Sequence, residues 1–529
     1  MAEPVAYTAI ATALLVLVTA TLEKAGVPSF ILRWSVFVAI MLMAVLAANA
    51  VWPDRLSHYV VSRRRVSPVM AGIGQLMSVA PAGLALAYLG GGFQADVMEI
   101  TLVGLVAGLW VSTLLIGIPL NRSGAYSLPQ FLEVRFQSRL IRLLAVVLLA
   151  VPTMLLLCGQ LLAFGHLAAH LLGLAPRAAI VICAAIACAA VWLAGSRGAL
   201  IVGAVIFATL VIAFGAYYWL AGVDLAATRP AGGLPVAVAV DLPKAALPYL
   251  PREGALALPV DNPWVDRLAF AAGLAAAMSV MPVFTQFHPM AASGLKTLRS
   301  GLAATLLILV SAAVFGSIRP VAPFLNPDGA SQGAFADLAG IALLATIPAS
   351  AAFLLFGLAG LLSLDRPLGR AISENRKLIA ARLTVLVLAV VMGWLTLAWL
   401  QRMLVPAAIA LFACSATVFP IAVAAGWWRK CGALAALASM LAGCIATGGV
   451  AVVSSGLWDP RALLNEQSPV IEFLVAVSPA GAGLLGLVVA VFVLVVFAAF
   501  YPERNERSKA LFDAIHGERE ERPLNEMVL

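Results

Sequence analysis

Two long apolar stretches of the sequence carry the same short pattern, a serine followed three residues later by a proline. The pattern reads S-V-A-P at residues 78–81, within the stretch 67–90, and S-V-M-P at residues 279–282, within the stretch 265–288. A proline removes one backbone N–H donor and displaces the carbonyl four residues earlier. We therefore predict that Pro81 and Pro282 interrupt two helices and free carbonyl groups that can hold a polar ligand. An ordinary proline kink, which membrane helices tolerate, is the alternative.

Uncharged polar side chains near both patterns are the candidates for contact with a solute or a cation. Amides and hydroxyls both donate and accept hydrogen bonds, so they can replace water around a small polar molecule without adding charge. Gln160 joins them as the only strongly polar residue in the central half of the stretch 140–172. The alternative for all of them is hydrogen bonding between helices. Thr285 and Gln286 also lie near the end of the stretch 265–288, where polar side chains are common. The substrate-binding candidates are Gln75, Ser78, Gln160, Ser279, Thr285 and Gln286.

Sequence signals for proton transfer, catalysis or metal binding are weak or absent in this sequence. No Asp, Glu, Lys or Arg lies in the middle third of any predicted span, which argues against a proton relay of carboxylates or a voltage sensor. No P-loop, HExxH or GxSxG motif occurs, so we predict that the chain is not an enzyme and needs no cofactor. His166 and His170 have the spacing of a metal pair on one helix face, but no third ligand is visible, and polar packing is the favoured interpretation. The six cysteines show neither metal nor disulfide spacing.

The composition indicates that these residues lie on membrane helices. Of the 529 residues, 63% are hydrophobic and 11% are charged, and the mean hydropathy is +1.03. These values predict an all-α polytopic membrane protein. The net charge of +8 is explained by basic cytoplasmic loops, so no nucleic acid partner is expected. About 14 transmembrane helices are predicted, over residues 4–22, 30–52, 67–90, 98–120, 140–172, 178–195, 199–221, 265–288, 297–318, 336–362, 378–399, 403–426, 432–454 and 470–500.

The distribution of basic residues orients the chain in the membrane. With fourteen spans both termini lie on one side, and 23 of the 33 Lys and Arg residues fall in the loops and tail of that side. The positive-inside rule therefore predicts cytoplasmic termini in an inner or plasma membrane. The arginines at 63–65 and the basic run 366–382 are expected to contact anionic lipids at the cytoplasmic face. No obligatory protein partner is inferred.

The spans fall into two equal groups. Residues 67–221 and residues 265–426 each hold five predicted spans, and the first span of each group carries the serine-proline pattern. Because five is odd, the second group enters the membrane from the opposite side, as the inverted repeats of secondary transporters require. The predicted units are 1–66 with two spans and a basic cytoplasmic loop, 67–221 as the first repeat, 222–264 as an extracytoplasmic loop, 265–426 as the inverted second repeat, 427–500 with two spans, and 501–529 as a cytoplasmic tail.

Four segments together resemble the sodium/solute symporter family and, within it, the cation/acetate symporter branch. The similar segments are the basic entry at residues 63–78 to the first core helix, the segment 126–136 that ends in an Arg-aromatic pair, the glutamine-glycine stretch 159–165, and the glycine-rich helix with a central proline at 262–287. The resemblance extends over about residues 30–515. It implies a LeuT-type core of two inverted five-helix repeats with flanking helices, alternating access, and sodium-coupled uptake of a small organic solute, which is a monocarboxylate in the closest branch.

The sequence departs from this branch at positions that the resemblance implies for sodium. Gln75 replaces an acidic residue, and the two positions where the family has hydroxyls in the eighth core helix read Ala359 and Gly360. Backbone carbonyls and the hydroxyls of Ser78 and Ser350 are the remaining weak candidates, since carbonyls alone can hold a monovalent cation. The sequence therefore leaves open whether Na⁺ is the coupling ion, and we expect weak sodium affinity or sodium-independent transport.

Two hypotheses about function follow from the sequence. The first is a symporter-like secondary transporter that moves a small organic solute by alternating access. The second is a transporter-fold membrane protein that binds or senses a solute without ion-coupled transport. The identity of the solute depends on which side chains face the cavity, and the sequence leaves it open.

Overall fold

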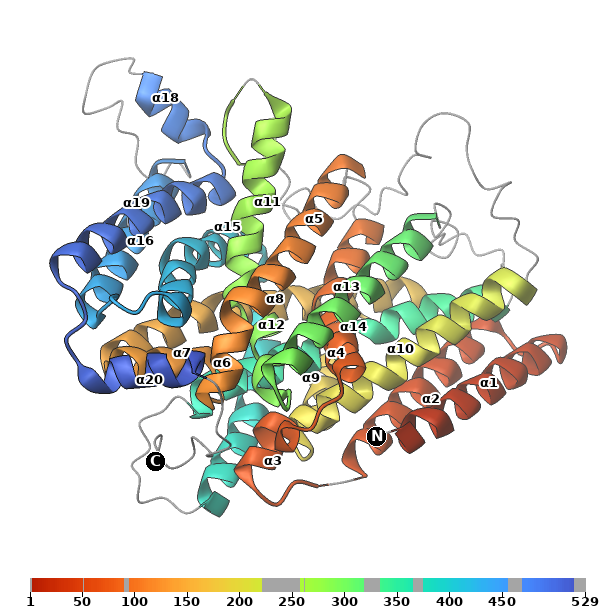
Figure 1. Cartoon of the computed structure of the whole chain (residues 1–529). Coiled ribbons are helices and arrows are strands. Elements are labelled where there is room, and N and C mark those ends of the chain that lie inside the picture. The colour runs from red at the N-terminus through yellow and green to blue at the C-terminus, as the bar shows by residue number, and fades with distance from the viewer. Residues whose placement is uncertain are drawn as a thin grey trace.

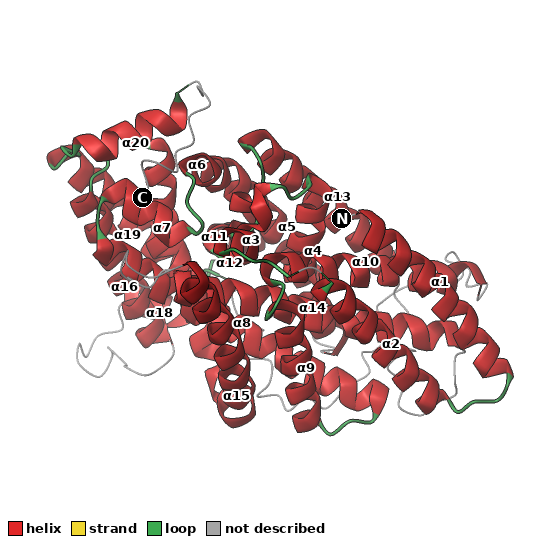
Figure 2. Cartoon of the chain, turned by 90° about the horizontal axis from the view of Figure 1, so that it is seen from below, coloured by secondary structure: helices red, strands yellow, loops and turns green. Residues whose placement is uncertain are grey.

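The computed structural model describes residues 2–50, 52–89, 95–220, 257–260, 262–317, 334–364, 374–454 and 469–517. Within these ranges the secondary structure is helical and no strand is present (Figure 2). The predicted all-α architecture is confirmed. The helices are α1 (Ala2–Lys24), α2 (Ser29–Asn49), α3 (Leu56–Val61), η1 (Ser62–Arg64), α4 (Pro68–Leu89), α5 (Ala95–Val111), η2 (Ser112–Gly117), α6 (Ile118–Ser123), α7 (Leu128–Phe136), α8 (Arg139–Leu172), α9 (Pro176–Val191), α10 (Gly195–Leu220), α11 (Pro263–Val280), α12 (Pro282–Thr285), η4 (His288–Met290), α13 (Gly294–Ser317), α14 (Ala334–Leu364), α15 (Glu374–Trp427), α16 (Ala433–Ser454), α18 (Pro469–Ala476), α19 (Pro479–Phe500) and α20 (Glu506–His516).

Ten of the described helical segments are long and apolar enough to cross a membrane, and an eleventh span results if the bent pair α11 and α12 is counted as one. Each of the fourteen predicted stretches lies on helix, but α1, α4 and α9 do not reach the required length in their described apolar part. The number fourteen therefore stays a prediction. The stretch 470–500 is split between α18 and α19. Most of the predicted loop 222–264 lies outside the described residues.

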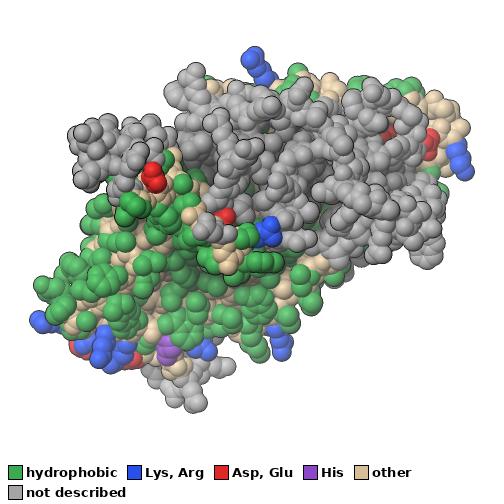
Figure 3. Space-filling view, turned by 90° about the horizontal axis from the view of Figure 1, so that it is seen from above, with side chains coloured by type: hydrophobic (Ala, Val, Ile, Leu, Met, Phe, Trp, Pro, Cys, Tyr) green, Lys and Arg blue, Asp and Glu red, His purple; other side chains and the backbone are tan. Residues whose placement is uncertain are grey.

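The outer surface of the helices is apolar, as a lipid environment requires. Large side chains such as Leu42, Val390, Val488 and Phe492 are more than half exposed. Figure 3 shows hydrophobic side chains over most of the coloured part of one face, with Lys and Arg side chains near its margins. The chain is a multi-pass membrane protein.

Helix α14 lies at the centre of the fold (Figure 1). Its apolar segment is 100% buried, and it contacts α2, α4, α8, α9 and α10. A helix that is apolar on all sides must be surrounded by protein or lipid, and here neighbouring helices surround it. Phe356, Gly357, Gly360 and Leu361 of this helix line a pocket beside α12.

The predicted interruption at Pro282 is present. Met281, between α11 and α12, has φ −66° and ψ 147°, and the two helices meet at 54°. Pro282 is the first residue of α12, where its missing N–H and fixed φ suit a new helix. The matching interruption at Pro81 is absent from the backbone, because α4 stays helical from Pro68 to Leu89. A proline inside a helix removes one hydrogen bond but does not require the neighbouring residues to leave the helical region.

The long helix α15 holds two predicted spans, 378–399 and 403–426. Its 54 residues would measure about 80 Å if straight. Near its start, Arg382 donates hydrogen bonds to the carbonyls of Pro53 (3.1 Å) and Leu193 (3.2 Å), beside α3. At its end, the carbonyl of Ala425 accepts from Arg135 of α7 (3.2 Å). Since α3 and α7 line one pocket together, both ends of α15 contact elements that surround this pocket.

Helix α20 packs against α6 and α7, on the side that is cytoplasmic in the predicted topology (Figure 1). The anchor is Arg135, whose side chain is 0% exposed. Its guanidinium donates to the carbonyls of Ala425, Trp428 (3.1 Å) and Arg429 (3.3 Å), and to the hydroxyl of Ser508 on α20. A second, exposed contact is the two-bonded ion pair of Arg429 with Asp513 (2.9 and 2.8 Å). The tail thus folds back onto α6 and α7.

Candidate functional site

A buried hydroxyl cluster joins α4, the interrupted helix and α14. The Oγ of Ser78 lies 3.1 Å from the carbonyl oxygen of Val283 and 2.9 Å from that of Gln75, so its single proton is shared between two acceptors. The Oγ of Ser350 on α14 donates to the carbonyl of Ser78 at 3.0 Å. Both serines are at most 2% exposed. The structure therefore brings together two residues that the sequence singled out separately as sodium candidates.

The break between α11 and α12 also frees backbone groups. The N–H of Met281 donates to the carbonyl of Met278 (3.2 Å), and Pro282 has no N–H. Apart from bonds between helical residues, no described backbone N–H donates to the carbonyl of Ser279 or Val280. The hydroxyl of Ser279 turns back to the carbonyl of Ala276 (2.8 Å), so this candidate is occupied by its own helix. Its carbonyl is the freer group.

Two further candidates have unsatisfied polar atoms. Gln75 is 0% exposed, and neither atom of its amide has a hydrogen-bond partner in the described part of the chain. The Oε1 of Gln160 on α8 is also buried without a partner there. A buried polar atom that lacks a partner costs about 1–3 kcal/mol, so such groups are expected to pair with a solute, an ion or water. No described hydrogen bond joins Gln160 to Gln75 or Ser78.

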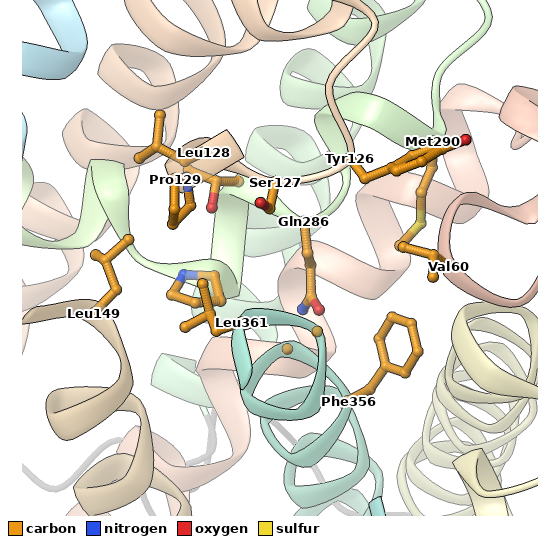
Figure 4. A pocket seen from close by; sticks show the side chains of 14 residues that line it. Val60, Tyr126, Ser127, Leu128, Pro129, Leu149, Gln286, Met290, Phe356 and Leu361 are labelled. Carbon is orange, nitrogen blue, oxygen red and sulfur yellow. The ribbon is translucent and has the colours of Figure 1, made fainter. Parts of the chain in front are cut away.

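A small pocket, with a cavity volume of about 40 Å³, opens beside α12 and α14 (Figure 4). The candidates Thr285 and Gln286 and the helix-breaking Pro282 lie in its wall. Thr285 is engaged by its own turn, since its hydroxyl donates to the carbonyl of Met281 (3.1 Å). Figure 4 shows the amide of Gln286 between Phe356 and Leu361 of α14. The other lining residues are Val60, Tyr126, Ser127, Leu128, Pro129, Leu149, Met290, Gly357 and Gly360.

The two missing hydroxyl positions do not lie beside Ser78. Ala359 is nine residues beyond Ser350, which is about 14 Å along a helix. Gly360 lines the pocket, and the carbonyl of Ala359 accepts a hydrogen bond from Ser363 (2.6 Å). On α14 it is Ser350 that reaches α4. Counting back from the end of the helix therefore selected residues at a different depth from the hydroxyl cluster.

No group of three or more His, Cys, Asp or Glu side chains that could hold a metal occurs among the described residues. His166 has an interaction partner, and the side chain of His170 lies outside the described part. All six cysteines are free.

Sequence reasoning missed His288, which lies just past α12. It is 0% exposed, and its Nε2 lies 2.9 Å from the Oγ of Ser112 in the π-helix η2. The amide of Asn121 donates to the carbonyls of His288 (2.9 Å) and Ala291 (2.8 Å). A π-turn inside an α-helix often marks a functional position. The only sequence signal was a histidine followed by a proline at the end of an apolar stretch.

Comparison with known proteins agrees with this architecture. Residues 59–231 match the family model described as Sodium:solute symporter family. No curated protein sequence matches the chain. The fold is similar to that of a Na⁺-coupled sialic acid symporter in a substrate-bound, outward-open state, with a TM-score of 0.61, 13% identity, and coverage of 90% of this chain and 98% of that chain. It also matches MHP1, a nucleobase-cation-symport-1 family transporter in a closed conformation with bromovinylhydantoin bound, with a TM-score of 0.47, 17% identity, and coverage of 88% and 99%.

At these identities the structural likeness shows the fold alone, while the sequence match covers the region from α3 through α10. Together they identify the chain as a multi-pass membrane protein with a LeuT-like transporter fold, similar over part of its length to the Sodium:solute symporter family.

Proposed function

We propose that this protein is a secondary transporter that moves a small organic solute by alternating access, through a path bounded by α4, the α11–α12 break and α14. The observation that carries the proposal is the break itself. It brings α12 beside α4, where the hydroxyl of Ser78 lies 3.1 Å from the carbonyl of Val283 and the Gln75 amide is buried without a partner among the described residues. Interrupted helices of this kind hold substrates and ions in transporters.

The pocket beside α12 supports an inward-opening state. Its wall includes Val60 of α3 and Tyr126 and Ser127 at the start of α7, which belong to the layer that the basic residues place in the cytoplasm. In this reading both termini are cytoplasmic. A monocarboxylate is the solute class that the resemblance to the cation/acetate branch implies.

Sodium is proposed to bind at the hydroxyl cluster. The carbonyl of Ser78 and the hydroxyls of Ser78 and Ser350 supply up to three oxygens within one hydrogen-bonding group, and the amide oxygen of Gln75 is one helical turn away. No carboxylate lies among them. At an effective dielectric of about 20, a carboxylate about 4 Å from the ion would contribute roughly 4 kcal/mol, so sodium binding through neutral oxygens is expected to be weak.

The test is uptake by proteoliposomes that contain the purified protein, with and without an inward sodium gradient. Ser350→Ala should reduce any sodium dependence, and Ser363→Ala, on the same helix but bonded within its own turn, serves as the matched control. Gln75→Asp should strengthen sodium dependence by adding the missing charge. Binding of a solute with no uptake under any gradient would support the alternative of a sensing or solute-binding protein and would refute transport.

A further inference from the structure

The chemistry of the pocket beside α12 points to a solute class other than the carboxylate of the similar branch. The inference rests on the proposed function, because it concerns what that same path recognises. It starts from Gln286, the one side chain in the wall whose amide atoms are both buried and without a partner among the described residues.

The position of this amide is fixed by its surroundings. The backbone N–H of Gln286 donates to the carbonyl of Pro282 (3.2 Å), which holds the residue at the end of α12. A Cβ on Gly357 would lie 3.1 Å from the Oε1 of Gln286 and 3.1 Å from the Cβ of Pro282. The bare backbone of α14 at Gly357 therefore gives the amide its place. Figure 4 shows this amide at the centre of the pocket.

The rest of the wall is apolar or uncharged. Leu149, Met290, Phe356 and Leu361 supply aliphatic and aromatic surface, and none of the described lining residues carries a charged side chain. A carboxylate that enters such a site loses its hydration without gaining a cation, which is expensive. An uncharged solute does not meet this cost.

A glutamine amide presents one donor and one acceptor side by side. Its complement is a group that offers an acceptor next to a donor, as another carboxamide does, so that two hydrogen bonds form in parallel. We propose that the pocket binds an uncharged solute through a carboxamide or an equivalent donor-acceptor pair on Gln286, with the apolar part of the solute against Phe356 and Met290.

The experiment uses pairs of molecules that differ only in this group. Propionamide is compared with propionate, and benzamide with benzoate, as ligands of the full-length protein in nanodiscs, by the shift of the thermal unfolding midpoint with ligand concentration. The amides should raise the midpoint in a saturable way. Each acid should bind about 10- to 100-fold more weakly than its amide, because it lacks the donor and brings a charge.

Two substitutions assign the effect to the proposed group. Gln286→Met keeps the length and removes both polar atoms, so the midpoint of the free protein should rise or stay unchanged while the response to amides is lost. Gly357→Ala pushes against the amide and should also weaken the response. Gly159→Ala, whose added Cβ has nothing within 4 Å, is the matched control and should respond like the native protein.

The outcomes separate this inference from transport itself. Equal or stronger stabilisation by the acids, or an amide response that survives in Gln286→Met, overturns the inference even if uptake of a carboxylate is measured. No response to either member of a pair shows that only water occupies the pocket and also overturns it. Gln286-dependent binding of amides without uptake keeps the inference and refutes transport.

Discussion

Replacing Arg135 is expected to release α20 from α6 and α7. The guanidinium is fully buried and donates four hydrogen bonds, three to carbonyls at and beyond the end of α15 and one to Ser508. It also lies 5.5 Å from the ring of Phe136 and 5.3 Å from that of Phe512. Of these hydrogen bonds only the one to Ser508 reaches α20, and a hydrogen bond from a charged group typically contributes about 1.5–3 kcal/mol. Its loss corresponds to a rise of about 10- to 150-fold in the population with α20 undocked.

The assay is limited proteolysis with trypsin, because Arg507 and Lys509 lie on α20. When opening is fast, the cleavage rate follows the population of the open form, so Arg135→Met should be cut at these residues at least tenfold faster. Arg135→Lys keeps the charge but cannot make the forked contacts, and an intermediate rate is expected.

Arg429→Gln is the matched control. Arg429 and Asp513 are 56% and 54% exposed, and exposed ion pairs contribute little. Comparable cleavage rates of Arg135→Met and Arg429→Gln would show that the buried contact of Arg135 stabilises α20 docking no more than the exposed ion pair does, and would refute this reasoning. The thermal midpoint of each variant, measured in parallel, distinguishes release of α20 from global unfolding.

Three other predictions follow from packing and charge. The hydrogen bond from Arg429 holds the pKa of Asp513 below its usual value of 3.8, so this carboxylate supports α20 docking above that pH and loses the effect as the pH falls through its lower folded-state pKa; because the pair is exposed the effect is small, and the protection factors of the α20 amides, which correct for the pH dependence of intrinsic exchange, should be constant between pH 5 and 8 and fall only below about pH 4. Gly443→Leu should destabilise by about 1–3 kcal/mol or more, since even a Cβ would lie 2.3 Å from the carbonyl of Ala416; the thermal midpoint should fall, whereas Gly448→Leu, with open space at its Cβ, should change it little. His288→Leu leaves the hydroxyl of Ser112 buried without its partner and should cost about 1–3 kcal/mol; an unchanged midpoint would show that this bond contributes nothing.

The architecture was accessible from the sequence because it follows from local patterns. Apolar length predicts helices in a membrane, and the S-V-M-P pattern predicted the break at Pro282. The same pattern failed at Pro81, where the backbone stays helical. A proline permits an interruption, and the tertiary surroundings decide whether one forms.

The candidate site was less predictable because it depends on relative depth between helices. Ser78 and Ser350 were both named from the sequence, yet only the structure shows that they touch. Counting from a helix end selected Ala359 and Gly360, about 14 Å along α14 from Ser350, because such a count does not fix where two helices cross. The role of Gly357 could not be predicted from the sequence. Its lack of a side chain matters only because Gln286, which lies 71 positions earlier in the chain, packs against it.

The complete burial of α14 has a consequence for how the protein is made. This helix has a mean hydropathy of 2.2 and includes no charge over most of its length, although almost no lipid contacts it in the folded state. Its composition therefore suits the moment of insertion, when a newly synthesised helix must partition alone into the bilayer. Of the helices that enclose it, α2, α4, α8, α9 and α10 are synthesised earlier, and α15 follows. During biogenesis α14 can therefore enter a cleft between the earlier helices and displace lipid from it, and α15 then covers a remaining side.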